Sequence, residues 1–506
     1  MWVDRFSEIS DRPRVARVVW LATAALISLL HLFVHTINLS YGDLPLDDAG
    51  TWGVARRPLF VVLTLPTEFH SQPPLYYIVL HFLVEISSAP WFLRGFSWLC
   101  VLLLLQFILF TLHELTLLAR TFLCLVLIFS HISNYLATAV RPYGMAALLT
   151  VVSSVMLVRA LQGPTRRRAV AYGLATVAML YTMAFEVAVL LAHGLFVMAV
   201  CLFAMPKLGW RAVLARYRTL LLALVCVVVA YVPYLLMAIH YQYKSNATKT
   251  MEKVLELGTY QNAIGDFFRL AGPVATGVYA LGVLGLVGEL RARNRTVLLW
   301  PLIAVLQIAF VWFFMVGRGG VGVQTKYMMP AFVAIAYLAA IGFDHPVPTT
   351  RRATWVVVPL LLVWLVRERY DAFAVYMETP AAVGPFGLLS REMAKQPGKK
   401  IIFFDVGYDG QHLEYVVRDD PNVITATMPG PGWASGGAHQ IDGAYVSDTI
   451  ERNAPTIRCF FYYHRNPNGP HATAFLPKLK QLGYKELPPL PSIHGRSVPG
   501  FCREDR

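Results

Sequence analysis

The sequence has too few charged residues for a soluble protein of its length. Asp, Glu, Lys and Arg make up 15% of the 506 residues, whereas a soluble domain usually carries about 25%. Apolar residues make up 56% of the chain. Apolar stretches of about 20 residues recur from Val18 to Leu365, and each is long enough to cross a hydrocarbon layer of about 30 Å. The shortage of charge therefore predicts a polytopic membrane protein.

The sequence also lacks the signals of several common cofactor sites. It contains no P-loop, and its six cysteines show none of the paired spacings of a zinc site. Cys100, Cys124, Cys201 and Cys226 lie in apolar segments, where cysteine usually acts as a small core residue. The sequence therefore gives no reason to expect a metal ion or another cofactor.

A cleavable signal peptide is not expected either. Residues 1–17 are polar and basic, and the apolar stretch that follows runs past Leu39. A secretory signal has an apolar core of only about 7–15 residues. We therefore expect residues 1–17 to be a cytoplasmic N-terminus, followed by a first membrane anchor.

The net charge of +14 is carried by short clusters rather than by one basic region. The clusters lie in connectors between apolar stretches, at residues 166–168, 207–218, 291–295 and 351–352. This is the positive-inside pattern, in which basic connectors stay on the cytoplasmic side of the membrane. It accounts for the charge without a nucleic-acid partner, and we expect none.

Placing the basic connectors inside gives a transmembrane module over residues 18–367, with outer loops at 40–72 and 241–268. Four apolar segments lie between residues 73 and 158, where only an odd number of crossings fits, and the one after Pro73-Pro74 is the first candidate for an incomplete span. Later spans are expected near residues 168–183, 184–205, 219–240, 270–289, 296–316, 326–343 and 353–367. The expected fold is mainly α, with about 11 to 13 transmembrane helices.

The character of the sequence changes after Arg367. The runs Ile401–Asp405 and Thr456–Tyr463 are typical of buried strands bounded by Gly, Pro and Asp. We expect residues 368–506 to form a small soluble α/β domain on the periplasmic side. Cys459 and Cys502 are its only cysteines, and an oxidising compartment would allow a disulfide between them.

The first outer loop carries two adjacent carboxylates, Asp47 and Asp48. If the pair is partly desolvated near the bilayer, one of them is expected to stay protonated or to need a cationic partner. Such a group suits the removal of a proton from an acceptor hydroxyl. The structural alternative is that Asp47 caps a juxtamembrane helix that begins near Asp48.

The next membrane entry begins at His70. This histidine is a candidate hydrogen-bond donor to a phosphate or an acceptor, and an ordinary position at a wet interface is an equal alternative. The aromatic residues that follow it fit an interfacial belt better than a substrate site. They are Tyr76, Tyr77, Trp91 and Trp98.

Polar residues recur at the predicted outer ends of later spans. Arg141 and Tyr143 open one span, Glu186 interrupts an apolar run, and Arg318 and Lys326 flank a glycine-rich loop. Charge at membrane depth is costly and usually functional, and Arg and Lys bind phosphate oxygens through charge-assisted hydrogen bonds. The cations are therefore candidate phosphate ligands. The alternative for each is a side chain that snorkels to the interface.

The order of these residues resembles a known family. The acidic pair is followed by a His-x-x-Pro-Pro-Leu-Tyr-Tyr entry, then by Arg94 with Ser97, Arg141-Pro142-Tyr143-Gly144 and Lys326-Tyr327. Over residues 18–345 this pattern is similar to the polyprenyl-phosphate-sugar-dependent glycosyltransferases of the GT-C fold. The nearest branch is that of bacterial protein mannosyltransferase-like and lipid A aminoarabinose transferase-like proteins, and the C-terminal α/β domain fits the same branch.

The resemblance implies an inverting glycosyltransferase of the bacterial inner membrane. Such an enzyme moves a sugar from a polyprenyl monophosphate to a glycolipid, lipopolysaccharide or protein on the periplasmic side. The base proposed for the family maps onto Asp47, and the second acidic position maps onto Asp48. Because a polyprenyl phosphate is already a good leaving group, this scheme needs no nucleotide site and no metal ion.

The resemblance also implies that Arg141 and Tyr143 line the substrate cavity and that Arg318 and Lys326 bind the donor phosphate. From its position in the sequence, we expect Arg141 to bind the phosphate as well. The side chains of His70, Glu186 and Tyr327 are expected to join Tyr143 in the cavity.

The sequence departs from the family pattern at three places. Asp48 stands where Glu is more common, and Thr51 followed by Trp52 stands where an aromatic residue is usual. Lys326 replaces the usual Arg before Tyr327. Because Lys is a point charge rather than a planar fork, we expect phosphate binding to differ in detail. The sugar and the acceptor are not identified by these residues.

A transporter or flippase for a lipid-linked substrate is the main alternative, with Arg141 and Glu186 lining its pathway. Transporters usually carry inverted repeats and interrupted helices in matching positions, and the sequence shows neither. A second alternative is a ligase or polymerase of surface polysaccharide, which would use a pyrophosphate carrier.

Overall fold

The computed structural model describes most of the helical part of the chain and the core of its C-terminal part. The described residues are 13–40, 44–64, 72–130, 133–246, 277–291, 295–317, 325–344, 359, 363, 366–367, 385–405, 415–428, 450–463, 477–488 and 498–503. They fall into two compact units. The helix-bundle unit lies within Met1–Ser40 and Pro58–Glu378, and the sheet unit lies within Tyr41–Arg57 and Thr379–Arg506.

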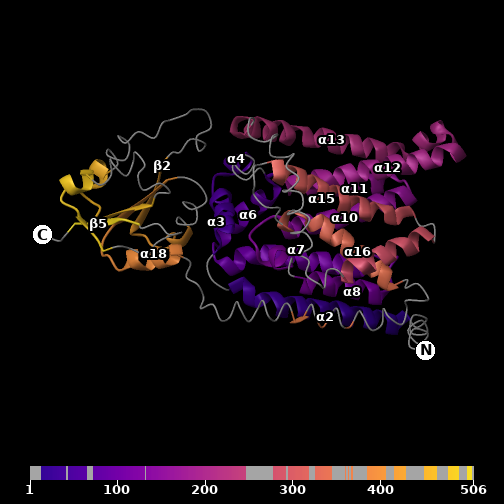
Figure 1. Cartoon of the computed structure of the whole chain (residues 1–506), viewed down its shortest axis with the longest axis horizontal. Helices are drawn as coiled ribbons and strands as arrows, with labels where there is room; N and C mark the ends of the chain where they lie inside the picture. Colours follow the sequence, from indigo (N-terminus) through magenta and orange to yellow (C-terminus); the bar gives the residue numbers. More distant parts are fainter. Residues whose placement is uncertain are drawn as a thin grey trace. The chain divides into compact units, whose positions relative to one another are not determined.

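Six helices among the described residues are long and apolar enough to cross a membrane. They are α2 (Pro13–Ser40), α7 (Pro90–Thr111), α10 (Tyr143–Gln162), α12 (Val187–Leu208), α13 (Trp210–Asn246) and α15 (Leu299–Gly317), and they run roughly parallel in Figure 1. Three shorter apolar helices are α6 (Leu75–Ile86), α8 (Leu117–Phe129) and α16 (Met329–Asp344). The prediction of a mainly α, multi-pass membrane protein is therefore confirmed.

The helices follow the apolar segments of the sequence. The four segments expected between residues 73 and 158 correspond to α6, α7, α8 and α10, with the short α9 (Ser133–Thr138) before α10. Helix α6 has 12 residues, which span about 18 Å at 1.5 Å per residue, and it is therefore shorter than the hydrocarbon layer. The pair expected near residues 168–205 consists of α11 (Arg166–Leu180) and α12. Most of the last expected span, near residues 353–367, lies outside the described residues.

Helix α13 shows why this composition suits lipid rather than water. Leu222, Val229 and Leu236 are about 60% exposed, at 60%, 62% and 62%. They recur every seven residues, or two helical turns, so they form one outward stripe. Leu220 and Val227 lie on the opposite side and are almost completely buried. An apolar residue on the outward side costs nothing in hydrocarbon, which is why the helix is apolar on both faces.

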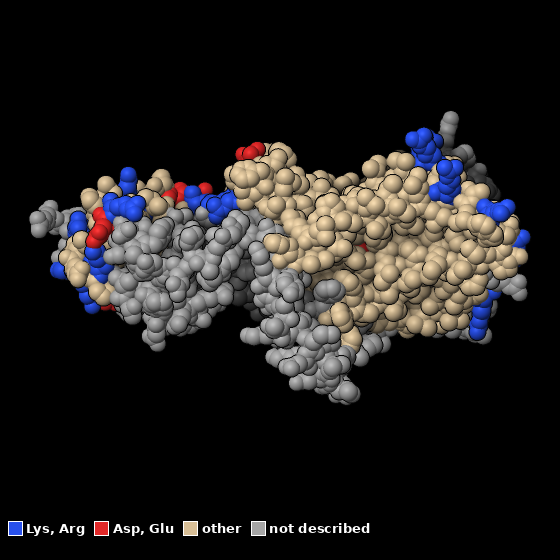
Figure 2. Space-filling view, turned by 90° about the horizontal axis from the view of Figure 1, so that it is seen from above, with Lys and Arg blue, Asp and Glu red and all other residues tan. Residues whose placement is uncertain are grey.

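The Lys and Arg side chains of the bundle that are visible in Figure 2 gather at one end of it, and the long flank beside them carries almost no charged residues. The ends of α7, α10 and α11 are joined there by arginines. Arg159 donates a hydrogen bond to the carbonyl of Thr111 over 2.8 Å, and Arg168 donates to the carbonyl of Arg159 over 3.1 Å. Cations at helix C-termini satisfy carbonyls that have no partner within the helix.

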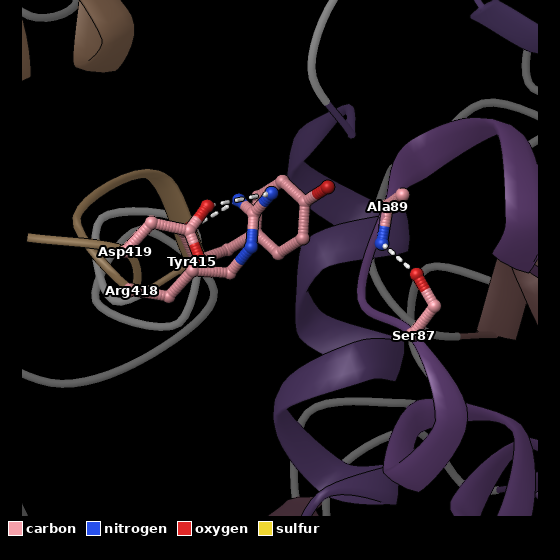
Figure 3. A network of polar contacts seen from close by, with 5 residues as sticks. All are labelled: Ser87, Ala89, Tyr415, Arg418 and Asp419. Carbon is pink, nitrogen blue, oxygen red and sulfur yellow. Dashed lines mark hydrogen bonds and ion pairs between the residues drawn. The ribbon is translucent and has the colours of Figure 1, made fainter.

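The start of α7 is set by local sequence. Pro90 occupies the first turn, where its fixed φ suits the helix and its missing N–H costs nothing. The Ser87 hydroxyl accepts a hydrogen bond from the backbone N–H of Ala89 over 3.2 Å, as Figure 3 shows. This fixed start positions Arg94 and Ser97 one and two turns further along the helix.

The sheet unit contains a five-stranded sheet in the order β2-β1-β3-β5-β4. The strands are β1 (Lys400–Asp405), β2 (Val423–Met428), β3 (Cys459–Tyr463), β4 (Lys485–Glu486) and β5 (Gly500–Cys502). β1 pairs in parallel with β2 and β3, whereas β5 is antiparallel to β3 and β4. A small α/β domain was predicted here, and the fold confirms it.

Both faces of strand β1 are buried. Ile401 and Phe403 pack in one apolar cluster, whereas Ile402 packs in another with Leu389 and Met393 of α18 (Pro385–Ala394). Successive side chains of a strand point to opposite faces, so β1 needs apolar residues at successive positions between its two ends. That requirement explains the continuous run Ile-Ile-Phe-Phe.

A disulfide joins the two cysteines that the sequence singles out in this domain. Cys459 of β3 lies directly opposite Cys502 of β5, with a Cα–Cα distance of 4.2 Å. The bridge closes a loop with a sequence separation of 43 residues. Closing a loop of this size in the unfolded chain stabilises the folded unit by about 4 kcal/mol in the chain-entropy model.

Candidate active site

The acidic pair lies in the first turn of helix α3 (Leu46–Ala55). Pro45 occupies the N-cap position without a side-chain hydrogen bond, so the alternative in which Asp47 caps the helix is wrong. Both carboxylates instead lie where the helix dipole favours negative charge. Asp48 is only 4% exposed, whereas Asp47 is half-buried. Asp47 is therefore the more accessible acid.

Helix α3 belongs to the sheet unit, whereas the domain boundaries expected from sequence put residues 40–72 in the transmembrane module. The ring of Trp52 meets the ring of Tyr415 edge to face, with centroids 5.1 Å apart. Arg56 follows directly after α3, and its guanidinium lies 4.7 Å from the centroid of the Trp52 ring. Burial, and then the neighbouring Arg57, lowers the pKa of Arg56 to about 10, so it stays charged at neutral pH.

Tyr415 is itself held by the turn that follows it. The guanidinium of Arg418 lies 3.9 Å from the ring centroid and donates a hydrogen bond of 2.6 Å to the carbonyl of Tyr415. Figure 3 shows this arrangement, with Arg418 also paired to Asp419 over 3.3 Å. Tyr415 is completely buried.

In the helix-bundle unit, Ser97 of α7 contacts both α6 and the segment just before α10. Its hydroxyl lies 3.3 Å from the hydroxyl of Tyr76 on α6 and donates to the carbonyl of Ala139 over 2.6 Å. It also lies 3.5 Å from the carbonyl of Arg141. This serine therefore fixes the backbone just before α10, where the buried Arg141 stands.

Gly144 explains why the Arg141-Pro142-Tyr143-Gly144 run needs its last residue. A Cβ at this position would lie 2.5 Å from the carbonyl oxygen of Leu136 and 3.1 Å from that of Ser97. Such contacts are too short for a carbon atom, so only glycine lets the start of α10 approach α7 this closely.

Tyr143 and Tyr327, two residues of the predicted cavity, lie against each other. Their ring centroids are 6.2 Å apart in an edge-to-face arrangement, and Tyr327 also packs on Phe185 at 4.9 Å. Tyr327 lies in the 3-10 turn η4 (Thr325–Tyr327), and its carbonyl accepts a hydrogen bond from Gln307 over 3.1 Å. Lys326 lies 5.6 Å from the centroid of the neighbouring Tyr327 ring.

Glu186 follows Phe185 in the turn η1 (Ala184–Glu186) and is completely buried. Its Oε2 accepts a hydrogen bond of 2.8 Å from the hydroxyl of Thr150 on α10. The turn is fixed from the α6 side as well, because the N–H of Ala184 donates to Gln72 over 3.2 Å. Glu186 is thus a buried carboxyl whose position is fixed by the segments around it.

The structure therefore brings four of the predicted residues into one neighbourhood. Tyr143, Tyr327, Lys326 and Glu186 are connected through the ring of Phe185 and through α10. Arg141 lies two residues before Tyr143. His70 and Arg318 lie outside the described residues. Asp47 and Asp48 belong to the other unit.

Sequence reasoning misjudged two tyrosines and missed two other residues. Tyr76 and Tyr77 are completely buried, so their interpretation as belt residues exposed at the interface is wrong. Trp91, by contrast, is 58% exposed, as a belt residue should be. Phe185 and Tyr415 were not singled out, because a lone aromatic residue in an apolar run or a domain core carries no distinguishing signal.

No group of three or more His, Cys, Asp or Glu side chains in the described part of the chain has the arrangement of a metal site. The buried Arg141 and the rings described above are groups of the kind that contact an anionic, partly apolar ligand. Arg supplies planar donors for phosphate oxygens, and aromatic rings offer contact area for apolar or sugar faces.

The sequence matches no protein-family model and no curated protein. The fold, however, is similar to crystal structures of ArnT from Cupriavidus metallidurans. The structure in the apo state covers 96% of this chain and 98% of its own, with a TM-score of 0.61 and 15% identity. The structure bound to undecaprenyl phosphate covers 94% and 97%, with a TM-score of 0.59 and 15% identity.

The chain has the GT-C fold. The likeness spans both the helix bundle and the sheet unit, because it covers almost the whole of each chain. It confirms the fold expected from the order of motifs in the sequence. At 15% identity the GT-C likeness carries no residue-by-residue assignment.

Proposed function

We propose that this protein is an inverting glycosyltransferase that takes a sugar from a polyprenyl monophosphate and passes it to an acceptor hydroxyl of a glycolipid, lipopolysaccharide or protein on the periplasmic face of a bacterial inner membrane. The observation that carries the proposal is the GT-C fold over 96% of the chain, shared with ArnT. One of the ArnT structures holds undecaprenyl phosphate, which belongs to the class of carrier that the motif residues suggest here.

The proposed reaction uses Asp47 as its base. The acceptor hydroxyl gives its proton to the Asp47 carboxylate, and its oxygen forms a bond to the anomeric carbon of the sugar. The bond from that carbon to the phosphate oxygen breaks on the opposite face, and the phosphate leaves with the electron pair. Attack and departure on opposite faces invert the anomeric carbon. The partial exposure of Asp47 and the burial of Asp48 favour Asp47 for this role.

Cations are proposed to stabilise the charge that grows on the leaving phosphate. Arg141, Arg318 and Lys326 are the candidates. Arg141 is favoured among the described residues because it is buried and its backbone is fixed next to Ser97. A buried, fixed cation needs little reorganisation when the charge develops.

Tyr143, Tyr327 and Glu186 are proposed to line the cavity for the sugar or the first isoprene units, together with His70. The edge-to-face pair of Tyr143 and Tyr327 presents both ring edges and ring faces. Glu186 has one oxygen on Thr150, and its other oxygen, Oε1, is buried without a hydrogen bond among the described residues. That oxygen is available to a hydroxyl of the sugar. No metal ion and no cofactor enters this scheme.

The proposal is tested with purified protein in liposomes that contain a panel of radiolabelled polyprenyl-phosphate sugars and a bacterial envelope extract as acceptor. We expect loss of one labelled donor and appearance of a labelled product by thin-layer chromatography. Glu486→Gln on the exposed strand β4 is the control and should match the wild type. Transbilayer movement of intact donor without transfer would contradict the proposal and favour the transporter.

A further inference from the structure

Helix α3 is joined to the C-terminal part of the chain by successive contacts among four side chains. The guanidinium of Arg56 lies 4.7 Å from the centroid of the Trp52 ring, and the Trp52 and Tyr415 centroids are 5.1 Å apart. The guanidinium of Arg418 lies 3.9 Å from the Tyr415 centroid. Trp52 is 3% exposed and Tyr415 is completely buried. A buried edge-to-face pair in which each ring also has a guanidinium group over it has a defined geometry, because rings and guanidinium groups attract only in certain orientations.

The position of Trp52 on α3 determines which acid can face outward. Residues of an α-helix are about 100° apart around its axis, so Asp48 lies about 40° from Trp52 and Asp47 lies about 140° from it. A contact that holds Trp52 inward therefore holds Asp48 on the same side. It turns Asp47 away from the side of Trp52, and Asp47 is the more exposed of the two acids.

We propose that Tyr415 is a positioning residue for the acidic pair: through Trp52 it sets the rotation of α3 so that Asp47, and not Asp48, faces the acceptor. This inference rests on the proposed function, in which Asp47 is the base. It gives the C-terminal domain a part in catalysis that is separate from any binding of the acceptor. Tyr415 touches no reacting atom in this account and acts only through Trp52.

The anchoring of Tyr415 supports this role. Arg418 both lies over the ring and holds the backbone carbonyl of Tyr415, and Asp419 holds Arg418. The ring is thus fixed within a single short turn. By contrast, α3 has only ten residues and no side-chain cap, and an isolated helix of this length is marginal in water. Its orientation must therefore come from contacts such as the one between Trp52 and Tyr415.

The sheet unit contains a matched control for this arrangement. Tyr484 is also buried, packs edge to face on Phe460 at 5.1 Å, and has Arg503 over its ring at 4.8 Å. None of these three residues belongs to α3. Replacing Tyr484 removes a comparable ring and cation contact from the same unit, and it leaves the contact of Trp52 in place.

The test compares Tyr415→Leu, Tyr415→Phe and Tyr484→Leu in the full-length protein, with donor turnover and amide hydrogen exchange measured on the same preparations. A displacement of about 1 Å at a reacting group costs about 10²-fold in rate. We therefore expect Tyr415→Leu to lower kcat by about 30- to 100-fold with the donor KM unchanged. Tyr415→Phe keeps the ring and should restore kcat. The amides of α3 should exchange faster in Tyr415→Leu while those of β1 and β3 keep their wild-type rates.

The outcomes separate this inference from the proposed function. If wild type transfers sugar but Tyr415→Leu matches Tyr484→Leu in kcat, the positioning role is overturned and the function stands. If wild type transfers no sugar, the function is overturned. In that case the amide exchange rates of α3 still decide whether Tyr415 holds this helix. Unchanged rates in Tyr415→Leu would overturn the positioning role. If Tyr415→Leu does not fold, Trp52→Phe is used instead, because it weakens the same ring contact from α3. The same loss of kcat and the same faster exchange of α3 are then expected.

Discussion

The two units hold their candidate functional residues in different ways. In the helix bundle, the run from Arg141 to Gly144 is fixed at its backbone, because the Ser97 hydroxyl donates to the carbonyl of Ala139 just before it and Gly144 allows close approach to α7. In the sheet unit, α3 is held through the side chains of Trp52 and Tyr415. A backbone carbonyl still accepts its hydrogen bond when its own side chain is replaced, whereas a ring-to-ring contact is lost with either ring. The proposed base, Asp47 on α3, is therefore more easily displaced by a single substitution than the Arg141–Gly144 run.

The largest expected effect tests which acid of α3 does the chemistry. Asp47→Asn should lower kcat by about 10³-fold or more, because general-base catalysis contributes about 10²–10⁴-fold. Asp48→Asn should cost much less in kcat, because its side chain is buried. Both are measured as initial rates of donor consumption. Equal losses in the two variants would contradict the distinction drawn from their burial.

The next effect concerns the stability of the sheet unit alone. Replacing both Cys459 and Cys502 by Ser should destabilise this unit by about 4 kcal/mol, because the unfolded chain regains the conformational freedom that the disulfide removes. Hydrogen exchange of β1 and β3 measures the loss. Cys226→Ser on α13 is the control and should leave these strands protected. Unchanged protection in the double variant would show that sheet pairing alone holds β5.

A smaller effect is expected from the bundle's fixed cation. Arg141→Ala should lower kcat/KM by about 10²-fold, the usual cost of removing one group that stabilises developing charge. Arg141→Lys should restore only part of the loss, because Lys lacks the planar fork. Arg168→Ala, at the basic end of the bundle, is the matched control. A loss of equal size in Arg168→Ala would point to general destabilisation instead of phosphate binding.

The smallest effect concerns the buried carboxyl of the bundle. Thr150→Val removes the hydroxyl that donates to Glu186, and leaving a buried acceptor unsatisfied costs about 1–3 kcal/mol. The apparent melting temperature in detergent should fall accordingly. Thr176→Val is the control, because the Thr176 hydroxyl donates to the carbonyl of Tyr172 in its own helix and not to Glu186. Equal melting temperatures for the two variants would show that Glu186 does not depend on Thr150.

Much of the fold could be predicted from the sequence because its signals are local. Apolar length gave helices such as α7 and α10, and a continuous apolar run gave β1. The order of motifs gave the GT-C fold. These features depend on short windows of sequence, in which hydrophobic period and length are informative.

The remainder depends on contacts between distant positions. Nothing near Trp52 indicates that its partner is Tyr415, since both residue types are common in any domain core. Tyr76 and Tyr77 were misjudged for the same reason: an aromatic residue at a membrane entry looks the same in sequence whether it faces lipid or the hydroxyl of Ser97. Burial of this kind depends on packing between distant residues, and the composition of a short segment does not predict it.

In the proposed reaction the sugar is transferred from a polyprenyl monophosphate and the configuration of its anomeric carbon is inverted. This reaction is tested most directly with a donor whose anomeric carbon is labelled with ¹³C, by NMR of the transferred product together with assay of the released lipid. We predict a product of inverted configuration and one free polyprenyl monophosphate for each sugar transferred. Retained configuration, a released pyrophosphate, or intact donor on the opposite leaflet would contradict the account.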